Sequence, residues 1–306
     1  MPLKYAEFFG EDPDSPEARG AFLARSCRFL GEECSKRFGN GLQSGACSLL
    51  NPRNPLPVIC CPKRFYADNH ALLDHVSAMA FGSDVPVVKK DQKMPDAGSF
   101  VLAFGQGYGH EIRVPYATEA SRSLLSIDWI LALVGADQEL REFVALEVQT
   151  IDTTGNYQRE YQRWAEQFDP NRVADDSISG RGCGSNFNFE NVNKRILPQL
   201  ITKGNVLRRE NLCSKGLFFA CPQIVLDRIK RRVGDLQVCP MQTGAITFLG
   251  YSLERKAHER RYALTLSERL TTTSDQLYLA FTSPRRLPPA GVYEEAVRKA
   301  LRERLR

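Results

Sequence analysis

Short apolar runs separated by polar turns fill the middle of the chain, and their pattern predicts strands. Four runs are rich in β-branched and aromatic residues and are bounded by Gly, Pro or polar residues: SFVLAFGQ, GHEIRVP, SIDWILALV and EFVALEVQTID. The segment GNYQREYQRWAEQF then changes period, because its large apolar side chains recur at i, i+4, i+7 and i+11, which predicts a helix. These side chains are Tyr157, Tyr161, Trp164 and Phe168.

Strand and helix candidates continue to alternate toward the C-terminus. NVNKRILPQLITK predicts a helix that Pro198 kinks or shortens, and LFFACPQIVLDRIKRRVG predicts a buried strand followed by a helix with a basic face. AITFLGYSLE and DQLYLAFTS are further strand candidates, and VYEEAVRKALRERLR predicts a terminal amphipathic helix. The predicted fold class is therefore α/β, with a mixed sheet flanked by helices.

The first part of the chain has a different composition. Residues 1–80 are rich in Cys, Gly and Pro and contain one helical pattern, YADNHALLDHVSAMAFG. The polar stretch from Ser83 to Ser99 then has the composition of a linker or a surface loop. We therefore expect two domains, a Cys-rich module over residues 1–95 and a larger domain over residues 96–306.

The net charge of +5 is distributed unevenly. Residues 1–100 carry 12 Lys and Arg against 12 Asp and Glu, residues 101–200 carry 9 against 14, and residues 201–306 carry 20 against 10. An acidic middle and a basic last third suit an enzyme that holds divalent cations on carboxylates and phosphates on basic side chains. The alternative is a set of C-terminal helices whose solvated faces are rich in Lys and Arg.

Targeting signals are not apparent. The first residues lack an apolar core, so we expect no secretory signal, and no apolar run approaches the length of a membrane span. We therefore expect a cytoplasmic protein without a membrane partner. In a reducing compartment, the nine cysteines are expected to be metal ligands or buried thiols and not a disulfide framework.

Asp128, Glu147 and Gln149 are the leading candidates for chemistry. Asp128 lies between Ile127 and Trp129 in a predicted strand, where an ionised carboxylate is costly without a partner. Glu147 and Gln149 are two residues apart on the next strand, so they project from the same face. Paired strands would bring the three together, and two carboxylates with waters suit Mg²⁺. The alternative is a polar strand face whose side chains are solvated.

The sequence around these acids resembles a known family. FVALEVQTIDTTGNY, with SIDWILALV before it, resembles the catalytic region of the NotI-like restriction endonucleases of the PD-(D/E)XK nuclease superfamily. The resemblance implies a fold in which one strand supplies an acid and the next supplies Glu-x-Lys, or Glu-x-Gln in this branch. It implies that Asp128 and Glu147 bind Mg²⁺ and that Gln149 takes the place of the lysine. It also implies that Glu111 is an upstream acid near the site.

Two positions depart from the superfamily pattern. Ile127 stands where a proline precedes the acid, and Gln149 has no positive charge. An amide can hold and orient a water molecule by hydrogen bonds, but it gives no ionic stabilisation of the charge that develops on a phosphorane. Because the NotI-like branch shares the glutamine, the resemblance still implies an active enzyme.

Cysteines cluster in the N-terminal module, where Cys27, Cys34, Cys47 and the Cys60–Cys61 pair are separated by six, twelve, and twelve or thirteen residues. Four thiolates around one ion can organise a segment that lacks a core, although buried or free thiols fit the same spacing. The resemblance implies a four-cysteine iron site, with Cys61 preferred over Cys60 because the last segment reads CPKRF. Iron and zinc both suit four thiolates, and such a closed site is structural.

Basic residues near the predicted basic helix are the candidates for DNA contact. Arginine can contact phosphates or read guanine edges, whereas ion pairs within the protein are the alternative for each residue. The resemblance also associates the target with GC-rich sites. The six candidates are Arg208, Arg209, Arg228, Lys230, Arg231 and Arg232.

The expected function is that of a type II restriction endonuclease, with the metal-binding module at residues 1–95 and the catalytic and DNA-binding domain at residues 96–306. It would cleave double-stranded DNA by Mg²⁺-dependent hydrolysis and act as a homodimer, because a symmetric site favours twofold symmetry. Two alternatives remain. One is a non-catalytic DNA-binding protein with a structural four-cysteine site, and the other is a structure-selective repair nuclease.

Overall fold

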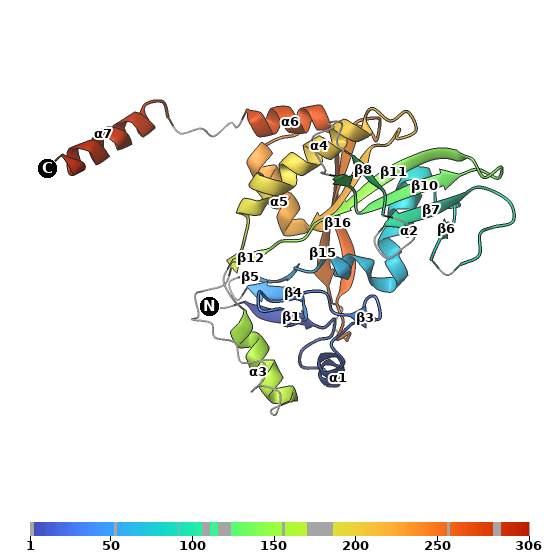
Figure 1. Cartoon of the computed structure of the whole chain (residues 1–306), viewed down its shortest axis with the longest axis horizontal. Coiled ribbons are helices and arrows are strands. Elements are labelled where there is room, and N and C mark those ends of the chain that lie inside the picture. Colours follow the sequence, from blue (N-terminus) through green and yellow to red (C-terminus); the bar gives the residue numbers. More distant parts are fainter. Residues whose placement is uncertain are drawn as a thin grey trace.

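A seven-stranded mixed sheet forms the centre of the molecule (Figure 1). The computed structural model describes residues 3–51, 54–90, 92–105, 111–115, 124–154, 157–169, 186–255, 258–283 and 289–305. The strand order is β16-β15-β14-β11-β10-β7-β6. The β11–β14, β14–β15 and β6–β7 pairs are parallel, and the other pairs are antiparallel. The strands are β6 Val87–Val88, β7 Phe100–Gly105, β10 Trp129–Val134, β11 Leu140–Val148, β14 Leu217–Pro222, β15 Ala245–Glu254 and β16 Ala263–Thr273.

Helices cover both faces of this sheet. One buried cluster contains side chains of α4, α5 and α6, and a second contains side chains of α2. Alternation along β11 places Ala145 in the first cluster and Leu146 in the second, as the period of a strand requires. The helices are α2 Ala67–Phe81, the π-helical turn η2 Val192–Ile196 that leads into α4 Leu197–Leu207, α5 Gln223–Val233 and α6 Ser274–Thr282.

A smaller three-stranded antiparallel sheet, in the order β1-β4-β5, lies with α1 and α3 at one end of the molecule (Figure 1). Aromatic rings join these elements, since Phe8, Phe22, Tyr161 and Phe168 have ring centroids 5.8–6.3 Å apart. The helix α3, which follows the segment that contains Glu147 and Gln149, therefore packs on the N-terminal module. The elements are β1 Lys4–Phe8, α1 Pro16–Ala24, β4 Ala46–Asn51, β5 Asn54–Ile59, the 3₁₀ helix η1 Pro62–Tyr66 and α3 Gln158–Phe168.

Three two-stranded ribbons complete the described strands. GHEIRVP was predicted as one strand, and among its described residues, 111–115, the strand comprises Arg113–Pro115, which pairs with residues 124–126 outside the large sheet. Residues 106–110 lie outside the described residues. The ribbons are β2 Ser26–Cys27 with β3 Glu32–Glu33, β8 Arg113–Pro115 with β9 Leu124–Ser126, and β12 Thr153–Thr154 with β13 Asn186–Phe187.

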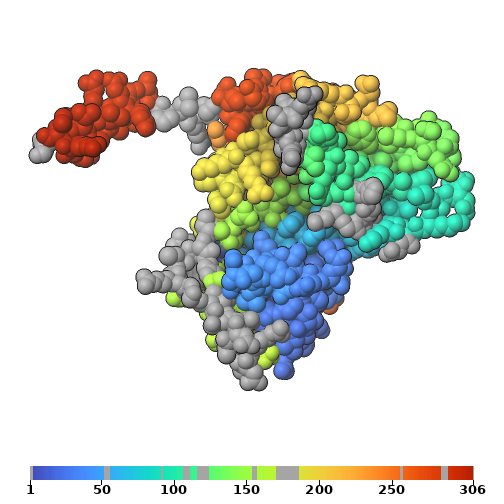
Figure 2. Space-filling view, in the orientation of Figure 1, coloured from blue at the N-terminus to red at the C-terminus, as the bar shows by residue number. Residues whose placement is uncertain are grey.

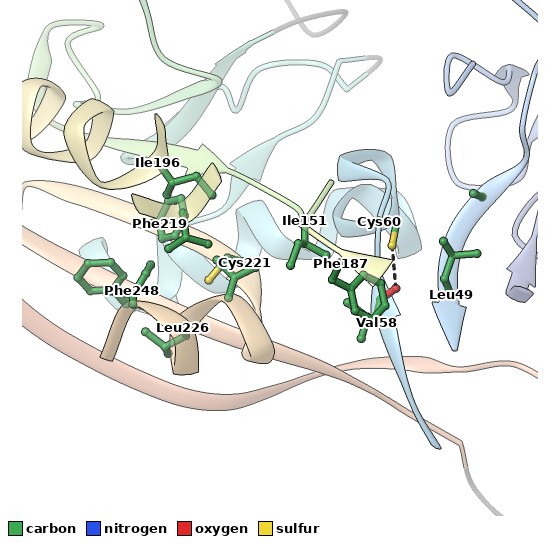
Figure 3. Close-up of a cluster of buried hydrophobic side chains, with 14 of the residues drawn as sticks. Leu49, Val58, Cys60, Ile151, Phe187, Ile196, Phe219, Cys221, Leu226 and Phe248 are labelled. Carbon is green, nitrogen blue, oxygen red and sulfur yellow. Dashed lines mark hydrogen bonds between the residues drawn. The ribbon is translucent and has the colours of Figure 1, made fainter. Parts of the chain in front are cut away.

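One hydrophobic core runs between the two larger sheets. Figure 3 shows Leu49 and Val58 of the smaller sheet, Ile151 and Phe187 beside them, and Phe219 of the large sheet, all members of one buried cluster. The N-terminal module thus shares its core with the large sheet. The predicted division of the chain at residue 95 stays a prediction.

The mixed α/β architecture is confirmed, but the strand predicted over DQLYLAFTS is wrong. This segment is α6, and the hydroxyl of Thr273 caps it by accepting a hydrogen bond from the Gln276 N–H at 3.2 Å. Leu277 is buried whereas Tyr278 and Leu279 are exposed, and two exposed neighbours do not fit the alternation of a strand. The sequence analysis also missed β16, whose largely polar residues form an edge strand.

The C-terminal helix α7, Val292–Arg304, confirms the predicted amphipathic helix. None of its residues is buried, and Figures 1 and 2 show it, in red, extending away from the two sheets. No helix within the described ranges combines the length and apolar character needed to cross a membrane.

A buried ion pair joins the smaller sheet to η1. Arg64 Nε donates to the Glu7 carboxylate oxygens at 2.9 and 3.1 Å, and the Ser48 hydroxyl donates to the same carboxylate at 2.8 Å. Arg64 Nη2 also donates to the backbone oxygen of Tyr262 at 2.6 Å. Burial raises the pKa of Glu7, and the positive charge of Arg64 opposes this. The arginine thus compensates a carboxylate that would otherwise be costly to bury.

We predict that Arg64→Met lowers the free energy of unfolding by about 3–5 kcal/mol, because the Glu7 carboxylate would lose its buried partner. Chemical denaturation followed by circular dichroism measures the change. The control is Arg37→Met, which removes the exposed Arg37–Glu33 pair and should cost less than about 1 kcal/mol. Equal losses in the two variants would contradict the proposed role of the buried pair.

Candidate active site

The start of β10 and the end of β11 lie together at one edge of the large sheet. The two strands are antiparallel, and Trp129 lies opposite Leu146. Asp128 and Glu147 are the next residues in this register, so both carboxylates reach the same edge. β14 pairs with β11 on its other side, with Phe219 opposite Glu147. The strand that carries Glu147 is therefore held from both sides.

Asp128 is fixed by the backbone of the neighbouring strand. Its Oδ2 accepts a hydrogen bond from the Val148 N–H at 2.8 Å. Burial, together with the negative charge of Glu147, raises the pKa of Asp128 to about 6, although the Val148 N–H and the positive charge of Lys203 oppose the shift. The two carboxylates therefore lie within electrostatic reach of each other, as the ligands of a shared cation must.

Glu147 is the more deeply buried acid, with only 4% of its surface exposed. Its Oε1 lies 2.6 Å from the ammonium of Lys203 on α4, and the Gln149 amide donates to the same oxygen at 3.5 Å. The other oxygen, Oε2, is buried and has no hydrogen-bond partner among the described residues. Such an atom is costly unless it binds a ligand.

A cavity of about 290 Å³ opens beside these residues. Asp128, Val148 and Gln149 line it, and Lys36, Lys63 and Arg195 add positive charge to the lining. This combination of carboxylates and cations is suited to a polyanionic substrate with a divalent cation. The other lining residues are Pro62, Tyr66, Thr150 and Asp152.

The structure brings together three of the four predicted catalytic residues. Asp128 and Gln149 line the cavity, and Glu147 contacts Gln149. The fourth, Glu111, forms an ion pair with Arg113 at 2.6 Å. Its charge still contributes to the raised pKa of Asp128. Glu111 therefore lies near the acidic pair, and its catalytic role stays a prediction.

Arg208 and Arg209 directly follow α4, the other four predicted DNA-contact residues lie on α5, and none of the six lines this cavity. Arg208 pairs with Asp275 at 2.7 Å, and Lys230 pairs with Glu268 at 2.6 Å. The Arg228 guanidinium lies 3.7 Å from a third carboxylate, that of Glu190. Ion pairing within the protein, the alternative considered for these residues, thus occurs at three of them. Contact with DNA stays a prediction for all six.

The four cysteines chosen as metal ligands come together in the N-terminal module. Cys27, Cys34, Cys47 and Cys61 are all buried free thiols. Burial raises the pKa of Cys47 well above its usual range, and the other three thiols and Glu7 raise it further. The four sulfurs therefore lie within electrostatic reach of one another.

Cys60 differs from these four cysteines. Its thiol donates to the Val58 backbone oxygen at 3.4 Å, inside the hydrophobic cluster drawn in Figure 3. Across the described ranges, no group of three or more His, Cys, Asp or Glu side chains is arranged to hold a metal ion. The structure thus shows no metal site at the cysteines, and the predicted iron or zinc stays a prediction.

Comparison with known proteins relates this geometry to a family. The chain matches the family model described as restriction endonuclease NotI over residues 24–218, more than half of its 306 residues. The chain belongs to the NotI restriction endonuclease family. No curated protein matches it at a significant level. NotI-family membership makes the chain a DNA endonuclease, and the matched span includes the four cysteines and the acidic cluster but ends before α5.

Lys203 is the residue near the NotI-family acids that the sequence analysis missed. It lies on α4 beside the buried residues Leu200, Gly204 and Leu207. A lysine on the buried face of a helix is unusual unless it has a charged partner. Its position among apolar residues therefore indicated a buried acidic partner. The sequence could not identify the partner, because Glu147 lies on a strand far from Lys203 along the chain.

The strand β7 passes so close to Asp128 that only glycine fits at position 105. Gly105 lies opposite Trp129 in the β7–β10 pair. A Cβ atom at Gly105 would lie 2.6 Å from the Asp128 backbone oxygen and 2.6 Å from the Trp129 ring. Backbone and a buried ring cannot move aside without displacing the acid.

We predict that Gly105→Ala lowers the free energy of unfolding by about 1–3 kcal/mol through overpacking, and that it slows DNA cleavage because Asp128 is displaced. Denaturation curves and a DNA cleavage assay measure the two effects. Gly20→Ala in α1 is the control, since open space surrounds Gly20 and alanine favours a helix by up to about 1 kcal/mol. Wild-type stability of the Gly105 variant would refute the prediction.

Proposed function

We propose that this NotI-family chain is a Mg²⁺-dependent type II restriction endonuclease that hydrolyses a phosphodiester bond at a specific site in double-stranded DNA. The observation that carries the proposal is the juxtaposition of Asp128 and Glu147 at one sheet edge, within electrostatic reach of each other. Two buried carboxylates in such proximity are unfavourable unless cations compensate them, and Lys203 contacts only one oxygen of Glu147.

The residues present fit Mg²⁺. This hard cation binds oxygen ligands and usually keeps several waters, so two carboxylates suffice to hold it. Asp128 and the unpartnered Oε2 of Glu147 are the protein ligands in this proposal. Mg²⁺ bound there would polarise the phosphate and lower the pKa of an attacking water.

Other residues around the cavity have roles that follow from their chemistry. The Gln149 amide can hold and orient the attacking water by hydrogen bonds. Lys36, Lys63 and Arg195 line the same cavity, and their charges suit the phosphates on either side of the scissile bond. In the reaction the water oxygen bonds to phosphorus and releases a proton to solvent, the bond to the leaving sugar oxygen breaks, and that oxygen takes up a proton from solvent.

We also propose that the enzyme acts as a homodimer on a symmetric DNA site. Cleavage of both strands at such a site needs two active centres related by a twofold axis, and an isologous dimer provides them.

We predict that Glu147→Gln lowers the cleavage rate at least about 100-fold, because the amide keeps the shape of the side chain but loses the charge that holds Mg²⁺. Plasmid cleavage in Mg²⁺ gives the rate, and a gel-shift assay without divalent cations should show DNA binding close to that of the wild type. Circular dichroism checks that the variant is folded, since Lys203 loses its charged partner.

The matched control for this experiment is Glu142→Gln, on the same strand. Glu142 pairs with Lys215 at 2.7 Å, so its substitution also breaks a Glu–Lys ion pair. Glu142 lies near the start of β11, whereas Glu147 lies near its end, beside Asp128. The control should cleave at the wild-type rate, and cleavage by the Glu147 variant at that rate would exclude Glu147 as a ligand. A wild-type protein that binds plasmid without cutting it would favour a DNA-binding protein. Nicking of branched DNA alone would favour a repair nuclease.

We further propose that Cys27, Cys34, Cys47 and Cys61 hold a structural iron or zinc ion. The support is the proximity of four buried thiols. Ion binding would require their sulfurs to draw closer together, and the binding energy would stabilise the module. Cys61 is favoured as the fourth ligand because Cys27 and Cys34 act electrostatically on its thiol, whereas the Cys60 thiol donates to the Val58 oxygen.

We predict that purified wild-type protein contains about one iron or zinc ion per chain, that Cys61→Ser removes it, and that Cys60→Ser keeps it. Serine at position 60 can still donate to the Val58 oxygen, so this control preserves the local hydrogen bond. Elemental analysis measures the ion, and visible absorption distinguishes ferric thiolate from zinc. Wild-type protein without metal, or equal metal content in the two variants, would contradict the assignment.

A further inference from the structure

Lys203 is a buried lysine placed directly on the acidic site. Its ammonium lies 2.6 Å from Glu147 Oε1, and only 11% of its side chain is exposed. It also lies within electrostatic reach of Asp128, whose pKa it lowers. Lysine is rarely buried to this extent, and a close carboxylate partner is the usual condition for it.

Tight helix packing fixes the base of this side chain. At the next residue, Gly204, a Cβ atom would lie 3.1 Å from the Ser274 side chain and 3.2 Å from that of Ile246. The helix α4 therefore approaches β15 and α6 too closely for a larger residue to fit easily. The ammonium is not sealed from solvent, because Lys203 also lines a cavity of about 280 Å³ together with Ser126 and Gln199.

We infer that Lys203 is the catalytic ammonium of this site and supplies, from helix α4, the positive charge that Gln149 lacks at the end of strand β11. The inference rests on the proposed nuclease function. As water adds to phosphorus, negative charge builds on the phosphoryl oxygens, and a nearby fixed cation stabilises that charge. In this role Lys203 acts through its charge alone and neither takes nor gives a proton in the hydrolysis.

A purely structural ion pair is the rival explanation. The pair of Lys215 with Glu142 of β11, whose atoms are 2.7 and 2.8 Å apart, is an example of such an ion pair at a distance from Asp128 and Glu147. A structural pair would affect folding stability and leave the rate constant of cleavage unchanged. A catalytic ammonium would affect the rate constant even when Mg²⁺ and DNA are saturating.

The test compares single-turnover cleavage of a plasmid that the wild type cuts, at saturating Mg²⁺, in variants of the full chain. Lys203→Met is expected to slow cleavage at least about 100-fold with DNA affinity unchanged, and Lys203→Arg is expected to retain most of the rate. Lys203→Gln is a second neutral variant, in case methionine impairs folding. Lys215→Met is the matched control and should cleave at the wild-type rate.

The decisive variant restores the charge from the strand. In Lys203→Met/Gln149→Lys, a lysine replaces Gln149, which directly follows β11 and lines the cavity beside Asp128, and we expect cleavage at least about tenfold faster than in Lys203→Met. A lost structural pair would not be rescued in this way.

Three results would overturn the inference. They are wild-type rates in both neutral variants, a defect that excess Mg²⁺ removes, and a double variant no faster than Lys203→Met. If the wild type cuts no DNA, the proposed function itself fails. If Glu147→Gln is inactive and Lys203→Met is fully active, only the role of Lys203 is excluded.

Discussion

Asp128 and Glu147 repel each other across the end of the β10–β11 pair, where burial also opposes the ionisation of Asp128. A site of this kind must be stabilised by groups that favour the charged forms. The Val148 N–H holds Asp128, and the Lys203 ammonium holds one oxygen of Glu147. These contacts require β10, β11 and α4 to meet at one point. The packing of α4 against the sheet therefore helps to hold the two negative charges close together.

The sequence predicted the part of the site that depends on local pattern. Strand alternation puts Glu147 and Gln149 on one face, and short apolar runs show that a strand follows Asp128 directly. Lys203 could not be predicted as a partner, because its contact with Glu147 depends on how α4 packs across the sheet. The α6 segment was predicted as a strand because its side chains favour β structure. In the structure the cap that Thr273 supplies begins a helix there. The NotI-like resemblance added the expected chemistry, and local pattern alone left it open.

Charge along the chain did not predict where cations gather in space. The last third carries the surplus of Lys and Arg, yet Arg208 and Lys230 there pair with acids. The cations that line the cavity beside Asp128 are Lys36, Lys63 and Arg195. The first two come from a part of the chain with no net charge. Folding brings them there because the N-terminal sheet shares a core with the large sheet.

The position of the two N-terminal lysines gives the cysteine module a connection to catalysis. Lys36 follows Cys34 by two residues, and Lys63 follows Cys61 by two. The Cys60 backbone oxygen accepts hydrogen bonds from Lys36 Nζ at 3.0 Å and from the Thr150 hydroxyl at 3.2 Å. The module therefore contacts the segment that follows Glu147. Any group that fixes the four thiols would also fix the backbone from which both lysines reach the cavity. In the proposed mechanism the module would therefore position charge for the DNA phosphates as well as stabilise the fold.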